Sequence, residues 1–96
     1  MANKFGTKIK ELREQQKLFL RHIAAQLDMD TAQLSKIENG ARQLKQEQLE
    51  PLAEILNTPL TELQTLWLAD QLFDLVKDQP NADEALKSVS KTIKKK

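Results

Sequence analysis

A pair of short amphipathic segments, separated by only three residues, limits the possible folds of this chain more than any other pattern in it. Residues 20–27 and 31–38 each carry apolar side chains at helical spacing, and residues 28–30 lie between them. Asp30 suits the N-cap of the second helix, because its carboxylate can accept hydrogen bonds from backbone N–H groups of the first turn. Gly40 suits the end of that helix, because glycine adopts the left-handed conformation without a steric penalty. Two short helices joined this tightly predict a helix-turn-helix.

The rest of the chain also has helical patterns. Leu, Lys, Glu, Gln and Ala dominate, whereas only two Gly, three Phe and one Trp occur, which predicts an all-α fold. Apolar spacing predicts further helices over residues 4–16, 46–56, 60–77 and 82–93. Pro51 is expected in the first turns of its helix, where the missing N–H matters least. We expect Thr58 to cap the next helix with Pro59 in its first position, and Asn81 to cap the last one.

The residue types exclude several kinds of site. The chain has no Cys, which excludes disulfides and thiolate metal sites, and its one His has no metal-ligand spacing around it. No glycine-rich phosphate loop occurs, and the scattered carboxylates match solvated helix faces. We therefore expect no enzyme activity, metal, cofactor or small-molecule ligand. No signal peptide or run of about 18 apolar residues occurs, so we expect a cytoplasmic protein without membrane contact.

The charges are distributed unevenly along the chain. Residues 1–45 carry nine Lys and Arg against five acidic residues, a net charge of +4. Residues 46–86 carry nine acidic residues and one Lys, a net charge of −8, and residues 87–96 carry five Lys and no acid. Two interpretations remain open: the basic half faces a polyanion while the acidic half avoids it, or the charges only solvate the surface.

The segment from residue 60 to residue 76 is apolar on most sides. Ten of its 17 residues are apolar, so a helix here must be buried on more than one face. Self-association would cover the second face, and so would the last helix if it folded back; both can hold together. In the first case, the expected dimer interface consists of Leu66, Trp67, Leu68, Leu72, Phe73, Leu75, Val76, Leu86 and Val89.

Several motifs resemble the Xre / lambda-repressor-like family. The matching pieces are Ile9-x-x-Leu12-Arg13, Ile23-Ala24-x-x-Leu27, the block from Leu34 to Gly40, Leu49-x-x-Leu52-Ala53-x-x-Leu56 and Leu60-x-x-Leu63. The resemblance implies a five-helix DNA-binding domain over residues 1–66. Residues 67–96 would form a helical extension that dimerises and ends in a basic tail, similar to that of small controller-type members. Family members bind short operators as dimers and mostly repress transcription; they include phage repressors, restriction–modification controllers and antitoxins.

The resemblance also assigns roles to positions. Those expected to read bases are Thr31, Ala32, Gln33, Ser35 and Lys36. A Lys can donate to guanine, a Gln can pair with adenine, and the methyl groups of Thr and Ala can pack on thymine. The open alternative is that Gln33 and Lys36 are ordinary solvent-facing residues. The positions expected to contact phosphates are Arg21, Asn39, Arg42 and Lys45.

The start of the first motif helix departs from the family pattern. The family has a Ser or Thr cap and then a DNA-contacting Gln, whereas this chain has Phe19 and Leu20. Arg21 and His22 are candidate substitutes for the lost phosphate contact, although a surface role fits His22 better. In the family, the position of Glu38 supports structure, so the resemblance implies an ion pair with Arg13 rather than a contact with DNA.

Together these features predict a transcriptional regulator, a repressor or a restriction–modification controller, that binds double-stranded DNA as a homodimer at an inverted repeat. The alternative is an antitoxin-like or adaptor module that keeps the fold but binds another protein. The absence of acidic residues from the expected base-reading positions favours the regulator.

Overall fold

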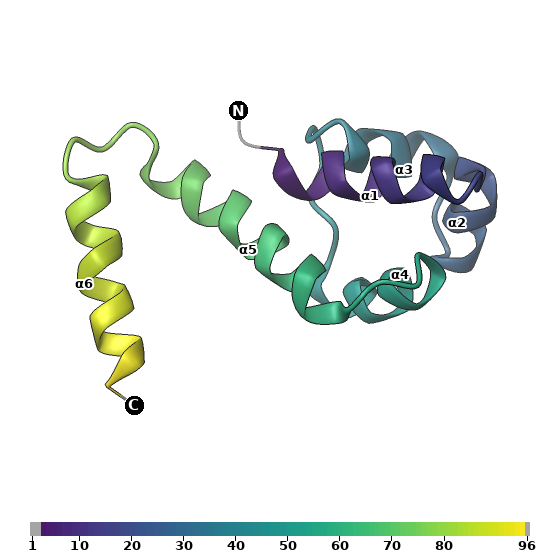
Figure 1. Ribbon diagram of the computed structural model, residues 1–96. Coiled ribbons are helices and arrows are strands. Elements are labelled where there is room, and N and C mark those ends of the chain that lie inside the picture. The colour runs from purple at the N-terminus through teal and green to yellow at the C-terminus, as the bar shows by residue number, and fades with distance from the viewer. Residues whose placement is uncertain (1–2, 96) are drawn as a thin grey trace.

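The computed structural model describes residues 3–95, and within this range it contains helices and no strand (Figure 1). The elements are α1 (Lys4–Gln15), α2 (Leu20–Gln26), α3 (Thr31–Glu38), the 3₁₀ turn η1 (Gln46–Gln48), α4 (Leu49–Ile55), α5 (Leu60–Val76) and α6 (Ala82–Lys94). The all-α prediction is confirmed. The helix predicted over residues 46–56 begins as the 3₁₀ turn η1, and Pro51 lies in the first turn of α4, as expected.

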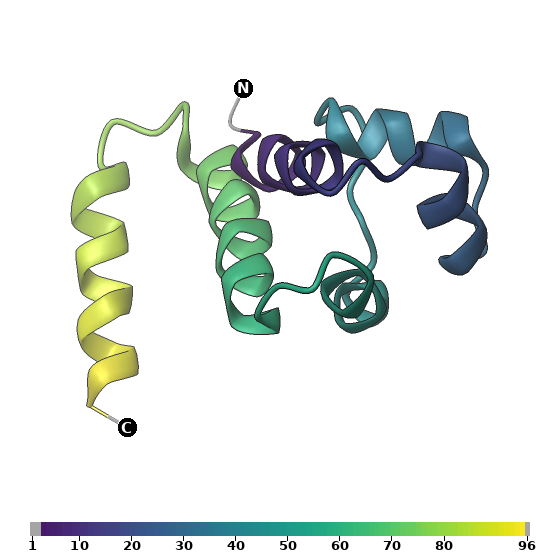
Figure 2. The ribbon, with the colours of Figure 1, turned by 45° about the vertical axis from the view of Figure 1, so that its right-hand side comes forward.

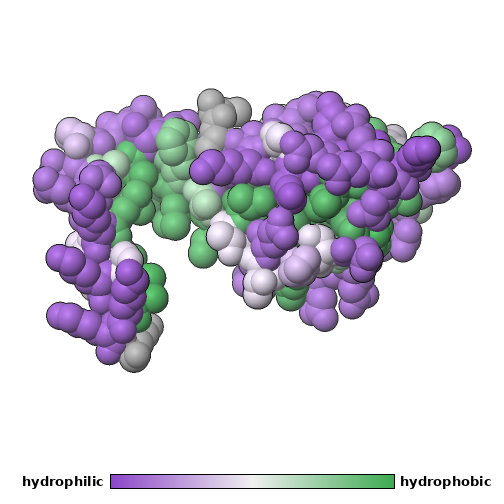
Figure 3. All heavy atoms as spheres, in the orientation of Figure 1, coloured by the Kyte–Doolittle hydropathy of each residue, from purple (hydrophilic) through white to green (hydrophobic). Residues whose placement is uncertain are grey.

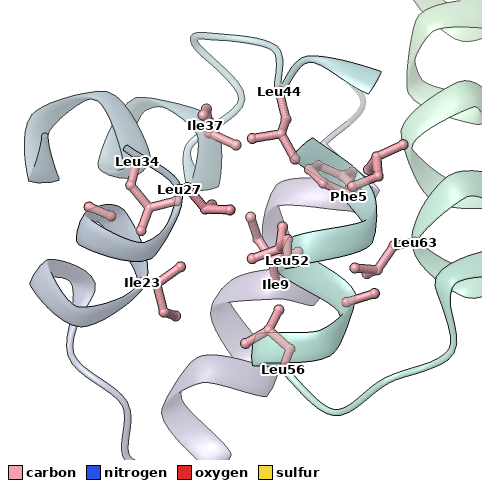
Figure 4. Close-up of a cluster of buried hydrophobic side chains, with 13 residues drawn as sticks. Phe5, Ile9, Ile23, Leu27, Leu34, Ile37, Leu44, Leu52, Leu56 and Leu63 are labelled. Carbon is pink, nitrogen blue, oxygen red and sulfur yellow. The ribbon is translucent and has the colours of Figure 1, made fainter. Parts of the chain in front are cut away.

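A single core joins the first five helices. Phe5 and Ile9 of α1 meet Ile23 of α2, Leu34 of α3 and Leu63 of α5, and all five side chains are buried (Figure 4). The side chains that complete this core are Ala24, Leu27, Ile37, Leu44, Leu49, Leu52, Ala53 and Leu56. Burying each large aliphatic side chain contributes about 1.5–3 kcal/mol, so this cluster is the main source of stability. It fixes α2 and α3 against α1.

The predicted capping residues are correct for α3, but the predicted N-cap of α5 is wrong. Asp30 accepts a hydrogen bond from the Gln33 backbone N–H at 2.7 Å, and Gly40 has a φ of +80°. In contrast, Pro59 rather than Thr58 is the N-cap of α5, and no side chain caps that helix. Asn81 does occupy the N-cap of α6, but its side chain makes no capping hydrogen bond.

Helix α1 is capped by a residue far away in the sequence. The Asp70 carboxylate of α5 accepts hydrogen bonds from the backbone N–H groups of Lys4 (3.1 Å) and Phe5 (2.9 Å). The first turn of a helix leaves such N–H groups without partners, and a carboxylate there also interacts favourably with the helix dipole. Asp70 therefore ties the start of α1 to the middle of α5.

We predict that Asp70→Ala lowers the free energy of unfolding by about 0.5–2 kcal/mol, the usual effect of losing an N-cap side chain. Urea denaturation followed by circular dichroism measures this. Asp78→Ala is the matched control, because Asp78 is exposed and follows the last turn of the same helix. Equal stability of the two variants would contradict the capping role.

Helix α6 stands apart from this body, and Figure 2 shows α5 and α6 separated along their lengths. The alternative in which the last helix folds back over the second face of α5 is therefore not what the structure shows. Of the large apolar side chains on α5 and α6, those left exposed are Leu68, Leu72, Phe73, Leu75, Leu86, Val89 and Ile93. No helix within residues 3–95 combines the length and the apolar character needed to cross a membrane.

Candidate DNA interface

Helix α3 presents one buried side and one open side. Leu34 and Ile37 point into the core beside Ile23 and Leu27 (Figure 4), which packs α3 across α2. The turn between the two helices is held by a hydrogen bond from the Met29 N–H to the Ala24 carbonyl at 2.9 Å. Asp28 within this turn has a φ of +57°, in the left-handed region that Asp tolerates better than most residues.

The residues expected to read bases lie on the open side of α3 or at its margins. Thr31, Ala32 and Lys36 are exposed, whereas Gln33 and Ser35 are half-buried. Positions 32, 35 and 36 share a helix face because they are three and four residues apart. Lys36 has the longest side chain of this exposed group and is its one cation.

Three of the four residues expected to contact phosphates follow the base-reading positions. Asn39 is the C-cap of α3, and Arg42 and Lys45 lie exposed on the segment after it. The Ala41 N–H donates to the Lys36 carbonyl at 2.9 Å, which turns this segment back over the end of α3. The fourth residue, Arg21, lies apart from them on α2.

The segment after α3 is anchored to α5, a contact that the sequence did not reveal. The Trp67 indole N–H donates to the Leu44 carbonyl at 2.7 Å, and both residues pack with the core. Trp67, expected in a dimer interface, is therefore half-buried against its own chain, and Leu66 is also partly buried there. This anchor keeps residues 40–45 close to the body of the domain.

The start of α2 has its own arrangement. Phe19 is the N-cap of α2 and makes no side-chain capping hydrogen bond, as its residue type implied. The Arg21 guanidinium carbon lies 4.7 Å from the centroid of the exposed Phe19 ring, and His22 meets that ring edge to face at 5.5 Å. A cation over an aromatic ring is attracted to it, so Phe19 orients Arg21 on this surface.

Glu38 is withdrawn from the interface, and its predicted ion pair with Arg13 is confirmed. The Arg13 Nε donates to one carboxylate oxygen at 2.7 Å and Nη2 donates to the other at 3.1 Å. Arg13 also donates from Nη1 to the Leu18 carbonyl at 3.2 Å, which connects α1 to the segment before α2. The hydrogen bond to Glu38 raises the pKa of Arg13 above its ordinary value, so the guanidinium stays charged.

The open surface of α3 and its following segment is therefore positively charged. From residue 31 to residue 45 the one acidic residue is Glu38, which is buried and paired. Lys36, Arg42 and Lys45 are exposed, and within residues 3–95 none of them enters an ion pair. A surface with three exposed cations and no exposed carboxylate between residues 31 and 45 is suited to a polyanion.

A family model described as a helix-turn-helix domain matches residues 4–66. The chain belongs to this helix-turn-helix family. Its Xre-like character, inferred from the motifs around Ala24 and Gly40, is confirmed. As a helix-turn-helix protein it is a DNA-binding transcriptional regulator rather than an enzyme.

One curated relative is similar to this chain in sequence. The control protein C.MunI of a Mycoplasma species is 41% identical over 61 residues, which cover 62% of this chain and 82% of the relative. No solved structure matches the chain. The family match ends at Leu66, so most of α5 and all of α6 lie outside it.

Proposed function

We propose that this helix-turn-helix protein is a cytoplasmic restriction–modification controller that binds an inverted-repeat operator as a homodimer. The observation that carries this proposal is the set of exposed cations Lys36, Arg42 and Lys45 on α3 and the segment after it, in a chain that is 41% identical to a control protein over 61 residues. We favour repression as the transcriptional sign, because the resemblance to the Xre / lambda-repressor-like family implies it.

Helix α3 enters the major groove in this proposal. Lys36 donates to guanine O6 and N7, Gln33 pairs with adenine, and Ser35 bonds to either. The methyl groups of Thr31 and Ala32 pack on thymine. Backbone phosphates are held by Arg21, Asn39, Arg42 and Lys45, which set the register of α3 without reading sequence.

Residues 1–66 form the DNA-binding part in this proposal, and residues 67–96 hold two copies together. Its support is the row of exposed apolar side chains on α5 and α6, because contiguous apolar patches on a protein surface mark interaction sites. Leu66 and Trp67 contribute only the edge of this interface, since they pack against their own core. The proposed contacts that remain open to a partner are Leu68, Leu72, Phe73, Leu75, Leu86 and Val89, with the half-buried Val76 beside them.

We predict that selection of bound duplexes from a random pool recovers an inverted repeat. A twofold dimer places two copies of α3 about 34 Å apart, so half-site centres should be about 10–10.5 base pairs apart. Footprinting should show protection on one face of the duplex. Affinity should fall steeply with salt, because bound Lys and Arg release counterions from the phosphates.

The same experiment distinguishes the second candidate function. The exposed apolar side chains of α5 and α6 also suit an antitoxin-like or adaptor module that binds another protein. Recovery of no preferred sequence, together with an affinity for DNA that is independent of salt, would favour that module and contradict operator binding.

A further inference from the structure

Helices α5 and α6 carry apolar stripes of matching period. On α5, Leu68, Leu72 and Leu75 are four and three residues apart and exposed. On α6, Leu86, Val89 and Ile93 are three and four residues apart and exposed. Alternating spacings of three and four residues are the pattern by which two helices interlock side by side. Each stripe is therefore shaped to receive another helix.

The two stripes do not cover each other within one chain. No hydrogen bond or ion pair joins α6 to the helices α1 to α5 within residues 3–95. Figure 3 shows the hydrophobic atoms of α6 on the side turned toward the rest of the molecule, across an open gap. The connection between the helices spans residues 77–81 and places α6 beside the end of α5 without packing it there.

We infer that α6 of each subunit packs on α5 of its partner, so that two copies exchange their last helices in a four-helix bundle. This inference rests on the proposed homodimer and adds that the helix covering α5 is the partner's α6. A second copy is the occupant that satisfies all the uncovered stripes at once, because a twofold axis seats both α6 helices and leaves none exposed. A different protein bound on α5 alone would leave the stripe of α6 in water.

Charge favours this exchange over direct contact between the two α5 helices. Helix α5 carries three acidic residues and no Lys or Arg, a net charge of −3. Helix α6 carries three Lys against two acidic residues in its first turn, a net charge of +1. Packing α5 on the partner's α5 would bring two acidic segments together. Packing α6 on the partner's α5 brings opposite charges within about 10 Å, the distance over which salt at 0.1 M screens them.

The positions of the Lys side chains on α6 also fit a helix whose apolar stripe is buried against the partner's α5. Lys87, Lys91 and Lys94 are four and three residues apart and lie on the face of α6 opposite to Val89. When the apolar stripe is buried against the partner, these ammonium groups remain in water and need no counterpart in the interface. The amphipathic pattern of α6 is therefore satisfied by a partner helix on one side and solvent on the other.

The test uses cysteine pairs, because the natural chain contains no Cys. Leu72→Cys and Val89→Cys lie at the centres of the two stripes. Two helices that pack on each other bring their centres together whether they run parallel or antiparallel, so this pair does not depend on their direction. When the two variants are mixed and oxidised, we expect a disulfide-linked heterodimer in at least about tenfold excess over either homodimer, since bridging requires Cα atoms about 4.4–6.8 Å apart. Lys87→Cys replaces Val89→Cys as the control on the opposite face, and it should give no such product.

The outcomes separate the exchange from the dimer itself. A crosslink formed by Leu72→Cys alone would show α5 packed on α5. A chain that carries both Leu72→Cys and Val89→Cys is oxidised as well, and an intrachain crosslink in it would show α6 folded back. Either result overturns the exchange. Light scattering of the natural chain reports the dimer independently, and operator selection reports DNA binding. A dimer that binds an inverted repeat but gives no mixed crosslink would disprove the exchange and leave the proposed function standing. A monomer would overturn both the dimer and the exchange.

Discussion

Glu38→Ala is expected to lower the free energy of unfolding by about 3 kcal/mol. The Glu38 side chain is 5% exposed and that of Arg13 is 14% exposed, so the variant leaves a guanidinium without its partner in a nearly dry site. Removing one member of a buried ion pair commonly costs about 3–5 kcal/mol. The lower end applies here, because Arg13 keeps some contact with water and its hydrogen bond to Leu18. Urea denaturation monitored by circular dichroism measures the loss.

Glu50→Ala is the control for this prediction, because Glu50 is an exposed carboxylate on α4. The double variant Arg13→Leu/Glu38→Leu should recover much of the loss, since apolar residues of similar volume replace a buried pair with little penalty. A loss below 1 kcal/mol for Glu38→Ala would show that the pair is not structural. Because the pKa of Arg13 is raised in the folded chain, raising the pH removes the stabilisation from the charged guanidinium only as the pH passes through that raised pKa, in strong alkali.

Lys36→Ala and Gln33→Ala are expected to weaken binding to the selected operator by about 1–3 kcal/mol each, which is about 5- to 150-fold in affinity. Each loss should be accompanied by relaxed discrimination at one base pair, because a side chain that reads a base edge contributes both affinity and specificity. Fluorescence anisotropy with the operator and with its single-base variants measures both effects. Lys36 lies exposed on α3 and Gln33 is half-buried, so neither truncation removes a core side chain.

Arg42→Ala is the matched control for the base contacts. Arg42 lies on the segment that turns back over the end of α3, and a phosphate contact carries no sequence information. The variant should therefore bind the operator and random duplex more weakly by the same factor. A changed sequence preference in Arg42→Ala, or an unchanged one in Lys36→Ala, would contradict the proposed division between base and phosphate contacts.

The sequence predicted α3 well because its determinants are local. Asp30 and Gly40 act on N–H and carbonyl groups within a few residues of themselves, so their roles follow from position and residue type. The ion pair between Arg13 and Glu38 was also predicted, but through the family resemblance rather than from spacing. The roles of the exposed residues on α3 stay predictions until binding is measured.

The error at Thr58 also has a local cause. Its N–H donates to the Ala53 carbonyl at 3.0 Å, and Asn57 before it has a φ of +51°. Thr58 therefore completes the end of α4 instead of starting α5, which leaves Pro59 as the N-cap. The pattern of a helix stop followed by a start was correct, but one residue was assigned to the wrong helix.

The helical segments and the apolar side of each helix could be predicted from residue patterns, because periodicity and turn chemistry act over a few residues. How these helices are tied together and covered became visible only in three dimensions. Asp70 caps α1 from 65 residues away, and Trp67 holds Leu44 from 23 residues away. Such contacts depend on where the chain returns in space, and no local pattern encodes that. The same reason applies to α5. Its many apolar residues were visible in the sequence, but only the packing of the helices leaves Leu66 half-buried against the core and Leu68 exposed.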